Sequence, residues 1–454
     1  MASPIPANLT YALRRVQAVS TQTFRLQPQN STSAQPGQTI RISLPSNCLL
    51  NTRSCKLYFA AAANGSGARL PAKIDSLIDR VYLEAGGVNI DGGSLSNYGI
   101  LRHAKDALEG ARGDAALSHP EMVRERSYHN GALVIAGVQA ETYISKDSFC
   151  VEFFEGFLGS CEPSILDVSL LPNITLCIQL ATTEVISTVS GVGMAEFVAN
   201  GDGSCSYSIG DIRMTCEAIG LGSGVYDQIV GRSIAERGML EVPFKQYMST
   251  IDHHTGSTKF HIASASLDRI WAVFRSATYA TQKAPVAVKG HREPGVTASY
   301  TPPGGGSASN VDVGIPGYDR GGVLRTNGEK YRGVAHTFVL DEDATAQFQL
   351  NGTLTPGFPA TVPELYGLSK NAVEPRGPSE CVTLDQYRSN YGVICHRLCL
   401  PGEGARQVAG VDTRGISLQG SLNTTNMSGY NVVLFHECTS VLQIGAGSQF
   451  SVVV

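Results

Sequence analysis

The sequence has 454 residues and a formal net charge of −4, and only 16% of the residues are charged, against roughly 25% in a typical soluble domain. Because 42% are hydrophobic, the chain can bury sizeable cores, and its length suits two domains of roughly 200 residues better than one. Binding to phosphate backbones needs clustered Lys and Arg, but Arg14-Arg15 is the only basic pair near the N-terminus, so specific nucleic-acid binding is not expected.

No segment has the pattern of a membrane anchor or a secretion signal. The apolar runs all fall short of the 18 residues or so that a transmembrane helix needs. Residues 1–12 contain Pro4 and Pro6 and lack the apolar core of a signal peptide, so we do not expect secretion. The cysteines number 11, which is odd, and several lie in apolar runs; this predicts reduced thiols packed in cores, as for Cys177, Cys216, Cys395, Cys399 and Cys438.

Taken in order, the chain begins with an arm over residues 1–20, which contains a short helical pattern at 9–19. Beyond the arm, alternation of apolar with polar residues predicts short strands. The fourth of these is broken at Gly86-Gly87 and the last slips at Gly210, so we expect turns or bulges at these glycines. In the first half the expected strands are 21–27, 38–44, 55–63, 74–91, 149–157, 173–181 and 204–219.

One helix and one long connection interrupt the strands of the first half. Apolar residues recur at helical spacing over 98–109, which predicts an amphipathic helix. Residues 110–137 are polar and are expected to form a loop at one end of the fold. A glycine-rich boundary follows at 220–238.

The strand pattern then restarts, and Pro243 marks the first run of the second half as an edge strand. Residues 283–333 are rich in Gly and Pro, and about 50 residues without an evident element indicate an exposed insertion or a partner-binding loop. A short helix is expected over 363–371 and a turn over 423–429. The expected strands are 239–248, 258–263, 267–276, 335–340, 347–354, 390–400, 416–422, 431–437, 441–444 and 450–454.

The order of elements repeats between the halves, and each half has about eight strands with a helix near its middle. In this comparison, residues 153–160 correspond to 394–404, and residues 172–184 to 429–440. The sequence therefore predicts an all-β chain of two tandem eight-stranded jelly rolls (β-sandwiches) with short helices in loops. We divide it into an arm (1–20), a first roll (21–220) and a second roll (221–454) that carries the insertion at about 283–333.

Two local stretches, SASLDRIWAVF (264–274) and DTRGISLQGSLN (412–423), together with this arrangement, resemble the double-jelly-roll major capsid proteins of double-stranded DNA viruses. The likeness is to the short members of polinton-like viruses and virophages, since the chain lacks the very long towers of the largest members. The resemblance implies a homotrimer that forms a pseudo-hexameric capsomer and an icosahedral shell around double-stranded DNA. It further implies neighbouring capsomers, penton proteins and minor or cement proteins as partners, a place in the virion capsid after assembly inside the host cell, and no enzymatic activity.

Several short motifs resemble metal or phosphate sites but have simpler interpretations. Cys395-His396 with Cys399 lacks the second ligand pair that zinc needs, and the spacing places both thiols on one face of a strand, in the core. Asp252-His253-His254 precedes Thr-Gly and is expected to be a solvated turn. The glycines at 220, 222 and 224 have no surrounding βαβ unit, so a dinucleotide loop is not expected.

Two acidic clusters are candidate catalytic or cation-binding groups. Glu152 and Glu155 could act as the acid and base of a glycosidase, but their spacing puts them on opposite faces of an ideal strand. Residues 341–343 (Asp-Glu-Asp) are expected to form a turn with at most weak cation binding. We therefore assign no catalytic, cofactor-binding or metal-binding residues.

Two other functions stay open at this stage. A two-domain β-sandwich carbohydrate-binding protein or adhesin would need clustered surface aromatic residues, and aromatic residues are only 7% of the chain. A carbohydrate-active enzyme would need two carboxylates that converge in a groove.

Overall fold

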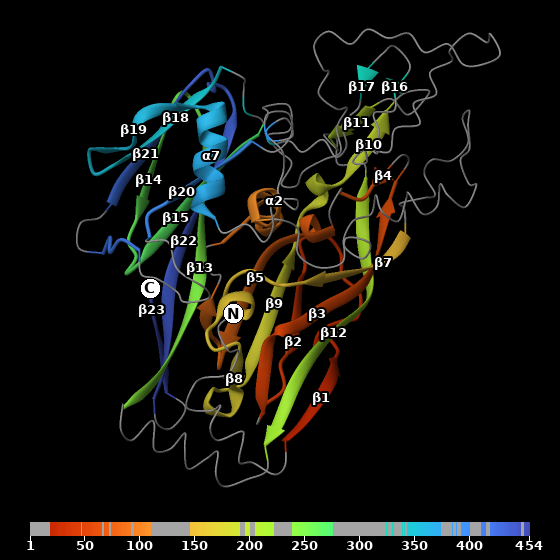
Figure 1. The fold of residues 1–454 in the computed structure, drawn as a ribbon. Coiled ribbons are helices and arrows are strands. Elements are labelled where there is room, and N and C mark those ends of the chain that lie inside the picture. The colour runs from red at the N-terminus through yellow and green to blue at the C-terminus, as the bar shows by residue number, and fades with distance from the viewer. Residues whose placement is uncertain are drawn as a thin grey trace, which may run out of the picture.

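The computed structural model consists of two antiparallel β-sandwiches that stand side by side (Figure 1). It describes residues 19–46, 48–65, 68–71, 74–91, 95–109, 146–190, 196–199, 205–221, 238–275, 324–325, 329–330, 338, 340, 343–373, 384, 387, 392–399, 410–414, 418–445 and 449–454. Everything said below of the structure concerns these residues.

The first sandwich is built from residues in the first half of the chain. One sheet has the strand order β1-β12-β3-β7, with β8 added to β3, over β1 (Val19–Leu26), β12 (Ser206–Leu221), β3 (Leu49–Asn64), β7 (Lys146–Glu152) and β8 (Ile165–Asp167). The facing sheet has the order β2-β9-β5-β6, over β2 (Thr39–Ser43), β9 (Ile174–Leu180), β5 (Ile78–Ala85) and β6 (Val88–Asp91).

The second sandwich is built from residues in the second half. One sheet has the order β13-β22-β15-β20, with β23 added to β22, over β13 (Met239–His253), β22 (Asn431–Gly445), β15 (Leu267–Arg275), β20 (Val393–Arg397) and β23 (Phe450–Val453). The facing sheet has the order β14-β21-β18-β19, over β14 (Ser257–Ile262), β21 (Leu418–Thr425), β18 (Thr345–Leu350) and β19 (Thr353–Thr361).

The two sandwiches have the same topology. If the eight main strands of each are numbered along the chain, one sheet runs first-eighth-third-sixth and the other second-seventh-fourth-fifth, in both halves. In both, a helix follows the fifth strand: α2 (Tyr98–Glu109) in the first half and α7 (Val362–Ala372) in the second. Two facing four-stranded sheets in this order form a jelly roll, so the prediction of two tandem jelly rolls is confirmed.

The strand order also corrects one part of the sequence comparison. Residues 172–184 contain β9, the seventh main strand of the first roll, and we matched them to 429–440. That segment lies in β22, which is the eighth strand of its roll and corresponds to β12. The true counterpart of β9 is β21. Matching by apolar content failed because β21 and β22 both pack against the core of the second roll, so apolar content does not distinguish one from the other.

The alternation of buried and exposed residues along the strands explains why they form a sandwich. Along β3, residues such as Leu57, Phe59 and Ala61 are buried while their neighbours are partly exposed, as expected of a strand with one face on a core. The slip at Gly210 is real, because the pairing of β12 with β3 shifts register between Gly210 and Arg213. The strand that contains Pro243, β13, is an edge of its sheet, as predicted.

Turns account for most departures from the expected elements. The expected strand 347–354 is the hairpin of β18 and β19, which reverses at Asn351-Gly352, both in the left-handed region. Gly86-Gly87 forms the same kind of turn between β5 and β6. The expected strand 149–157 ends at Glu152 and is followed by the short helix α5 (Phe157–Ser160). Residues 431–437 and 441–444 lie in one continuous strand, β22.

The remaining elements are short. They are a small sheet of β4 (Ala68–Arg69), β10 (Ser187–Ser190) and β11 (Glu196–Ala199), the pair β16 (Leu324–Arg325) and β17 (Glu329–Lys330), and the 3-10 helices η1 (Ile74–Leu77), η3 (Val168–Leu170) and η4 (Thr183–Val185). No helix in the described part of the chain is long and apolar enough to cross a membrane. Residues 1–18 of the arm, the loop at 110–137, most of the boundary at 220–238 and most of the insertion at 283–333 lie outside the described residues, while Val19 and Ser20 begin β1.

Candidate functional site

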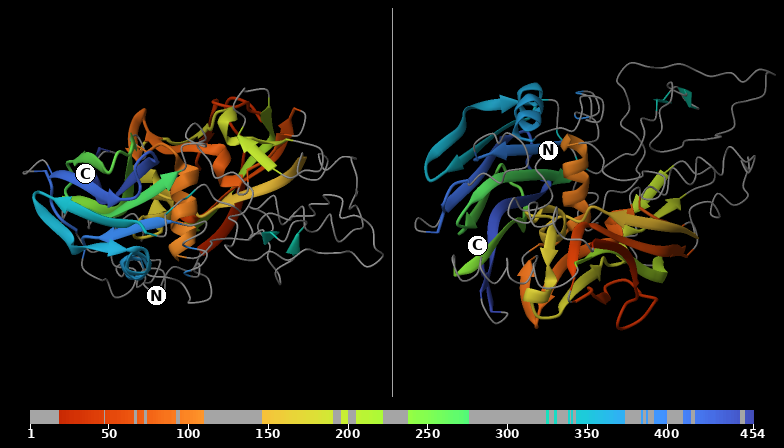
Figure 2. Two further views of the ribbon diagram at one scale, coloured as in Figure 1. Left: turned by 90° about the horizontal axis from the view of Figure 1, so that it is seen from above. Right: turned by 60° about the horizontal axis from the view of Figure 1, so that its bottom comes forward.

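The helix α2 lies between the two rolls, and both views in Figure 2 place it there. Every residue from Tyr98 to Leu108 is buried, including Arg102, Lys105 and Asp106. An amphipathic helix on the surface of one roll would leave its polar face in water. In this chain the second roll lies against that face, so the polar side chains of α2 become part of a junction between the rolls.

The start of α2 is packed closely on the first roll. The peptide groups of Ile100 and Leu101 both donate to the carbonyl of Asn97, which begins the helix. Gly99 lies so near η1 that a Cβ atom at this position would be 2.7 Å from the Cα of Ser76. The Ser76 hydroxyl also contacts Nε2 of His103 at 3.0 Å. Since the approach at Gly99 is to backbone atoms, it fixes where the helix lies on the first roll.

A buried carboxylate, that of Glu155, connects the basic side chains of α2. Arg102 Nη1 donates to Glu155 Oε1 at 2.9 Å, and Lys105 Nζ donates to Glu155 Oε2 at 2.8 Å. Arg102 also lies 3.7 Å from the carboxylate of Asp75. Burial acts to lower the pKa of Arg102, but the charges of Asp106, Asp75 and Glu155 raise it overall, so the group stays charged.

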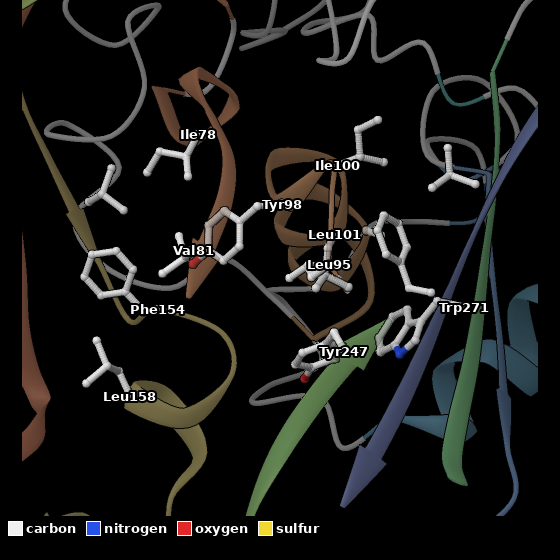
Figure 3. Packing of buried hydrophobic residues seen from close by; sticks show 14 of the residues in the cluster. Ile78, Val81, Leu95, Tyr98, Ile100, Leu101, Phe154, Leu158, Tyr247 and Trp271 are labelled. Atoms are coloured by element: carbon white, nitrogen blue, oxygen red, sulfur yellow. The ribbon is translucent and has the colours of Figure 1, made fainter. Parts of the chain in front are cut away.

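The same cluster reaches the second roll through Tyr247 on β13. Lys105 Nζ donates to the phenolic oxygen of Tyr247 at 2.8 Å and lies 5.1 Å from the centre of its ring. In Figure 3, Phe154 and Leu158 of the first roll lie to the left of α2, Trp271 of the second roll lies to its lower right, and Tyr247 of the second roll lies below it. The contact between α2 and the second roll therefore combines apolar packing with a buried hydrogen bond.

Further contacts connect β13 with the first roll along its length. The backbone nitrogen of Ser96 donates to Oγ of Ser249 at 3.0 Å. Near the other end of the contact, the backbone nitrogen of Lys245 donates to Oγ of Ser160 at 2.7 Å. Two further contacts are a backbone hydrogen bond of 2.9 Å from Glu162 to Pro243, and Phe157 edge-on to Phe244 with ring centres 5.0 Å apart. The first strand of the second roll is thus the surface that the first roll binds.

A second charged cluster continues the network inside the second roll. Arg269 Nη1 and the indole nitrogen of Trp271 donate to the two oxygens of Glu437, at 2.6 and 3.0 Å. Burial acts to raise the pKa of Glu437, but the positive charges of Arg269, Lys105 and Lys245 lower it to about 2. Because Lys105 belongs to α2, the two clusters influence each other electrostatically across the junction.

This arrangement favours fixing the orientation of the rolls. Its charged side chains are paired with one another, as buried charges must be. Removing one partner from such a pair is costly, whereas any rotation of one roll on the other would separate several pairs at once. We call this set of residues (Asp75, Arg102, Lys105, Glu155, Tyr247, Arg269, Trp271 and Glu437) the junction network.

The carboxylates considered as a glycosidase pair have separate roles. Glu155 is buried in the junction network. Glu152 makes a 2.6 Å ion pair with Lys56 near the surface. Each carboxylate therefore neutralises a different cation, which gives the pair a structural explanation.

The Cys395-His396-Cys399 motif lies in and just after β20. The Cys395 thiol is buried, and burial is the largest of the effects that raise its pKa well above the usual value. The ring of His396 stacks on Phe348 with centres 5.6 Å apart. Within the residues that the structure describes, no group of three His, Cys, Asp or Glu side chains could hold a metal ion.

The interpretation of Asp252-His253-His254 as a solvated turn was wrong, since Asp252 and His253 are the exposed end of the strand β13 and His254 is buried. This side chain is fully buried, with its ring nitrogens 2.7 Å from Oγ1 of Thr258 and 2.6 Å from Oγ1 of Thr424. It connects β14 with β21 because two threonines on paired strands present their hydroxyls to it. His253, by contrast, is exposed and contacts Asn431.

The other motifs are placed only in part. Asp343 lies in a turn, where its carbonyl accepts from the side chain of Asn426, and residues 341 and 342 lie outside the described residues. Gly220 is in β12, opposite Ser20, while Gly222 and Gly224 lie outside the described residues.

Comparison with known proteins gives structural but not sequence matches. No family model and no curated protein matches the sequence. The fold is similar to PBCV-1 VP54, in a structure fitted into a cryo-EM reconstruction of the virophage Sputnik, with a TM-score of 0.56 and 14% identity over 97% of this chain and 98% of that one. It is also similar to a quasi-atomic model of the PBCV-1 virus capsid (TM-score 0.55, 14% identity, 97% and 98% covered) and to the Faustovirus major capsid protein (0.52, 11%, 98% and 95%). The chain therefore has the double-jelly-roll fold that these capsid proteins have.

Proposed function

We propose that this chain is a major capsid protein, the subunit from which an icosahedral virus shell is built. The observation that carries the proposal is the match along 97% of this chain and 98% of PBCV-1 VP54, which includes both rolls and not one alone. A single jelly roll occurs in proteins of many functions. Two rolls in tandem, held at one fixed angle, are a much more restricted arrangement.

Three copies would form the assembly unit, a homotrimer with six rolls in a pseudo-hexameric ring. The junction network supports this step because it makes the two rolls of one chain a rigid third of such a ring. Closed rings form when each subunit contacts the next through two different surfaces related by a fixed rotation. A fixed angle between the rolls is what lets the ring close at three chains.

The trimers would then pack as capsomers into a shell that encloses double-stranded DNA, within the virion. Penton proteins and minor or cement proteins are the further partners we propose, along with neighbouring capsomers. The arm at 1–20 and the insertion at 283–333 are the segments that we propose to contact them, and we divide the rolls at residue 220. We assign the chain a structural and not an enzymatic role.

The composition of the chain and its exposed apolar side chains support assembly. Only 16% of residues are charged, and the cores of interfaces are depleted in charge. Large apolar side chains are nevertheless exposed in the isolated chain, namely Phe24, Val88, Phe153, Met239, Ile251, Leu354, Phe358, Leu368 and Val411. Burying such side chains between copies would supply much of the free energy of a shell.

The test is the mass of the purified protein in solution, measured by analytical ultracentrifugation, followed by electron microscopy of the same sample. We expect a species of three times the 48.1 kDa chain mass, with a hexagonal outline, or closed particles. A stable monomer at all concentrations would contradict the proposal. If such a monomer bound glycans on an array, the carbohydrate-binding function would replace it.

A further inference from the structure

One face of the helix α7 is left uncovered in the second roll. Glu364, Gly367, Leu368 and Asn371 follow the i, i+3, i+4, i+7 pattern of one helical stripe. Glu364, Leu368 and Asn371 are exposed and Gly367 is partly exposed, whereas the opposite stripe, which includes Val362 and Leu365, is buried. We call these four residues the outer face of α7.

The counterpart helix in the first roll shows how such a face is covered. In α2 the residues from Tyr98 to Leu108 are all buried, because the second roll lies on the side that the first roll leaves open. In α7 only Val362, Leu365, Ser369 and Ala372 are buried. The two helices occupy the same position in the same topology. The two helices contact each other, but the outer face of α7 stays exposed, whereas α2 is covered from Tyr98 to Leu108.

Gly367 is a second, independent observation. Glycine in the middle of a helix is unfavourable relative to other residues, so its presence usually has a steric reason. In α2 the reason is clear, since a Cβ at Gly99 would be 2.7 Å from the Cα of Ser76. At Gly367 a Cβ would meet no described atom within 4 Å. The helix therefore has a glycine suited to close approach, with no approaching group in its own described chain.

The chemistry of the outer face suits an apolar contact. Leu368 is 38% exposed, and Phe358, on the strand that leads into α7, is 48% exposed. The only charged group of the face, the Glu364 carboxylate, already accepts from the backbone nitrogen and the hydroxyl of Thr361, each at 2.8 Å, in a capping box. A partner would therefore meet a leucine and a glycine beside a carboxylate that already accepts two hydrogen bonds within the helix.

We propose that, within the trimer, the outer face of α7 is covered by the first roll of a second copy of this chain, as α2 is covered by the second roll of its own chain. The inference rests on the proposed function. In a closed ring of six rolls, first and second rolls alternate, so the far neighbour of a second roll is the first roll of the next copy. The chain's own junction is thus the template for the contact between copies.

The decisive variant is Gly367→Gln in the full-length chain, assayed by sedimentation over a range of concentrations. Glutamine is a better helix former than glycine, so the monomer should remain folded, with a melting temperature no lower than that of the unaltered chain. We expect the concentration at which the trimer dissociates to rise by about tenfold or more, as for residues central to an interface. Leu368→Glu should act in the same direction, and Val88→Glu, at a position 58% exposed on the first roll, should not.

The outcomes separate this inference from the proposed function. Suppose that the unaltered chain is a trimer and that both α7 variants dissociate at the same protein concentration as it does. The contact between copies then lies elsewhere and the inference is overturned, while the capsid role stands. If the unaltered chain is a monomer, the proposed function itself fails. If Val88→Glu dissociates the trimer as strongly as Leu368→Glu, an added charge alone weakens the trimer. The test then depends on Gly367→Gln, which adds no charge: a trimer as stable as the unaltered one would overturn the inference.

Discussion

The ammonium group of Lys105, on the first roll, donates a 2.8 Å hydrogen bond to the phenolic oxygen of Tyr247, on the second. The same ammonium group binds Glu155, so one buried side chain connects an acidic group of its own roll with a polar group of the other. Hydrophobic packing alone tolerates small rotations, whereas paired buried charges require defined geometry. The junction therefore specifies one angle between the rolls, which is the property a ring-forming subunit needs.

Replacing Glu155 by Gln should be among the most destabilising single changes at the junction. Arg102 and Lys105 would both lose their shared carboxylate while remaining buried. Breaking a buried ion pair by removing one partner typically costs about 3–5 kcal/mol. The measurement is the free energy of unfolding from urea titration at neutral pH.

Glu152→Gln is the matched control, three residues earlier in the chain. Its partner Lys56 has a side chain that is 42% exposed, and such surface pairs contribute about 0–1 kcal/mol. If both variants lose the same small amount, Glu155 does not hold the junction together. Tyr247→Phe should fall between the two, because it removes one hydrogen bond, at about 0.5–1.5 kcal/mol, and leaves every charge paired.

The sequence was informative wherever local chemistry decides the structure. The apolar spacing over 98–109 predicted α2 to the residue, and the slip at Gly210 predicted a real shift of register. Asn351-Gly352 was the missed signal, since Asn-Gly between apolar runs is a strong hairpin indicator, and it does reverse the chain between β18 and β19. Long strands such as β22 were divided in two because they carry polar residues, Glu437 among them, whose partners lie elsewhere in the sequence.

The junction network could not be found in this way. An amphipathic helix predicts that Arg102 and Lys105 face water. Instead Arg102 is paired with Glu155 inside the first roll, and Lys105 also reaches Tyr247 of the second roll, more than a hundred residues away. In the sequence, Glu155 stands out only as a possible catalytic partner of Glu152. Its position in the apolar run FFEGF was the available signal, because an acid among buried aromatic residues needs a buried cation.

Gly99→Ala should destabilise the chain although alanine favours helices. The new methyl group would meet the Cα of Ser76 at 2.7 Å and the carbonyl of Asp75 at 3.2 Å, and backbone atoms cannot move aside cheaply. Overpacking of this kind typically costs about 1–3 kcal/mol. In dilute, monomeric protein, Gly367→Ala should have the opposite sign, with a gain of about 0.5–1 kcal/mol, because a Cβ there meets no described atom. Equal effects of the two changes on the melting temperature would show that α2 is not held closely against η1.

The described cysteines should differ in their reaction with an alkylating reagent. All ten of them are free thiols, and only Cys48 and Cys399 are partly exposed. Thiolates are the reactive form, and burial, the largest cause in each case, raises the pKa of the Cys161 and Cys216 thiols to about 11. We expect mass spectrometry of the native protein treated with iodoacetamide to find Cys48 and Cys399 modified well before the buried eight. Early modification of Cys161 or Cys216 would mean that the first roll opens readily.

Acid should weaken the second roll through its buried histidines. Burial lowers the pKa of His436 to about 3, and it lowers the pKa of His396 and His254 as well. His436 contacts only Oγ1 of Thr250, at 3.4 Å, and the ring of Phe260 among the described groups around it, so no anion there favours its charged form. An unfolded histidine takes up a proton near pH 6.5, whereas folded His436 resists until about pH 3. The contribution of His436 is therefore complete above pH 6.5 and is lost as the pH falls toward 3, by about 1.4 kcal/mol per pH unit.

The variant His436→Phe isolates this effect, because phenylalanine fills a similar volume beside Phe260 and cannot take up a proton. Between pH 6.5 and 5 the unaltered chain should lose about 2 kcal/mol of unfolding free energy through this one histidine. Burial acts to raise the pKa of Glu437, but Arg269 and the two lysines outweigh it and hold the pKa at about 2. Such a carboxylate contributes little to the change in unfolding free energy between pH 6.5 and 5. Urea titrations at the two pH values should show a loss smaller by that amount in His436→Phe, and a change of the same sign in His396→Phe, whose pKa is also lowered by burial. If His436→Phe loses as much unfolding free energy between the two pH values as the unaltered chain, the proton is taken up by another group. The buried histidines would then not explain the acid sensitivity of the second roll.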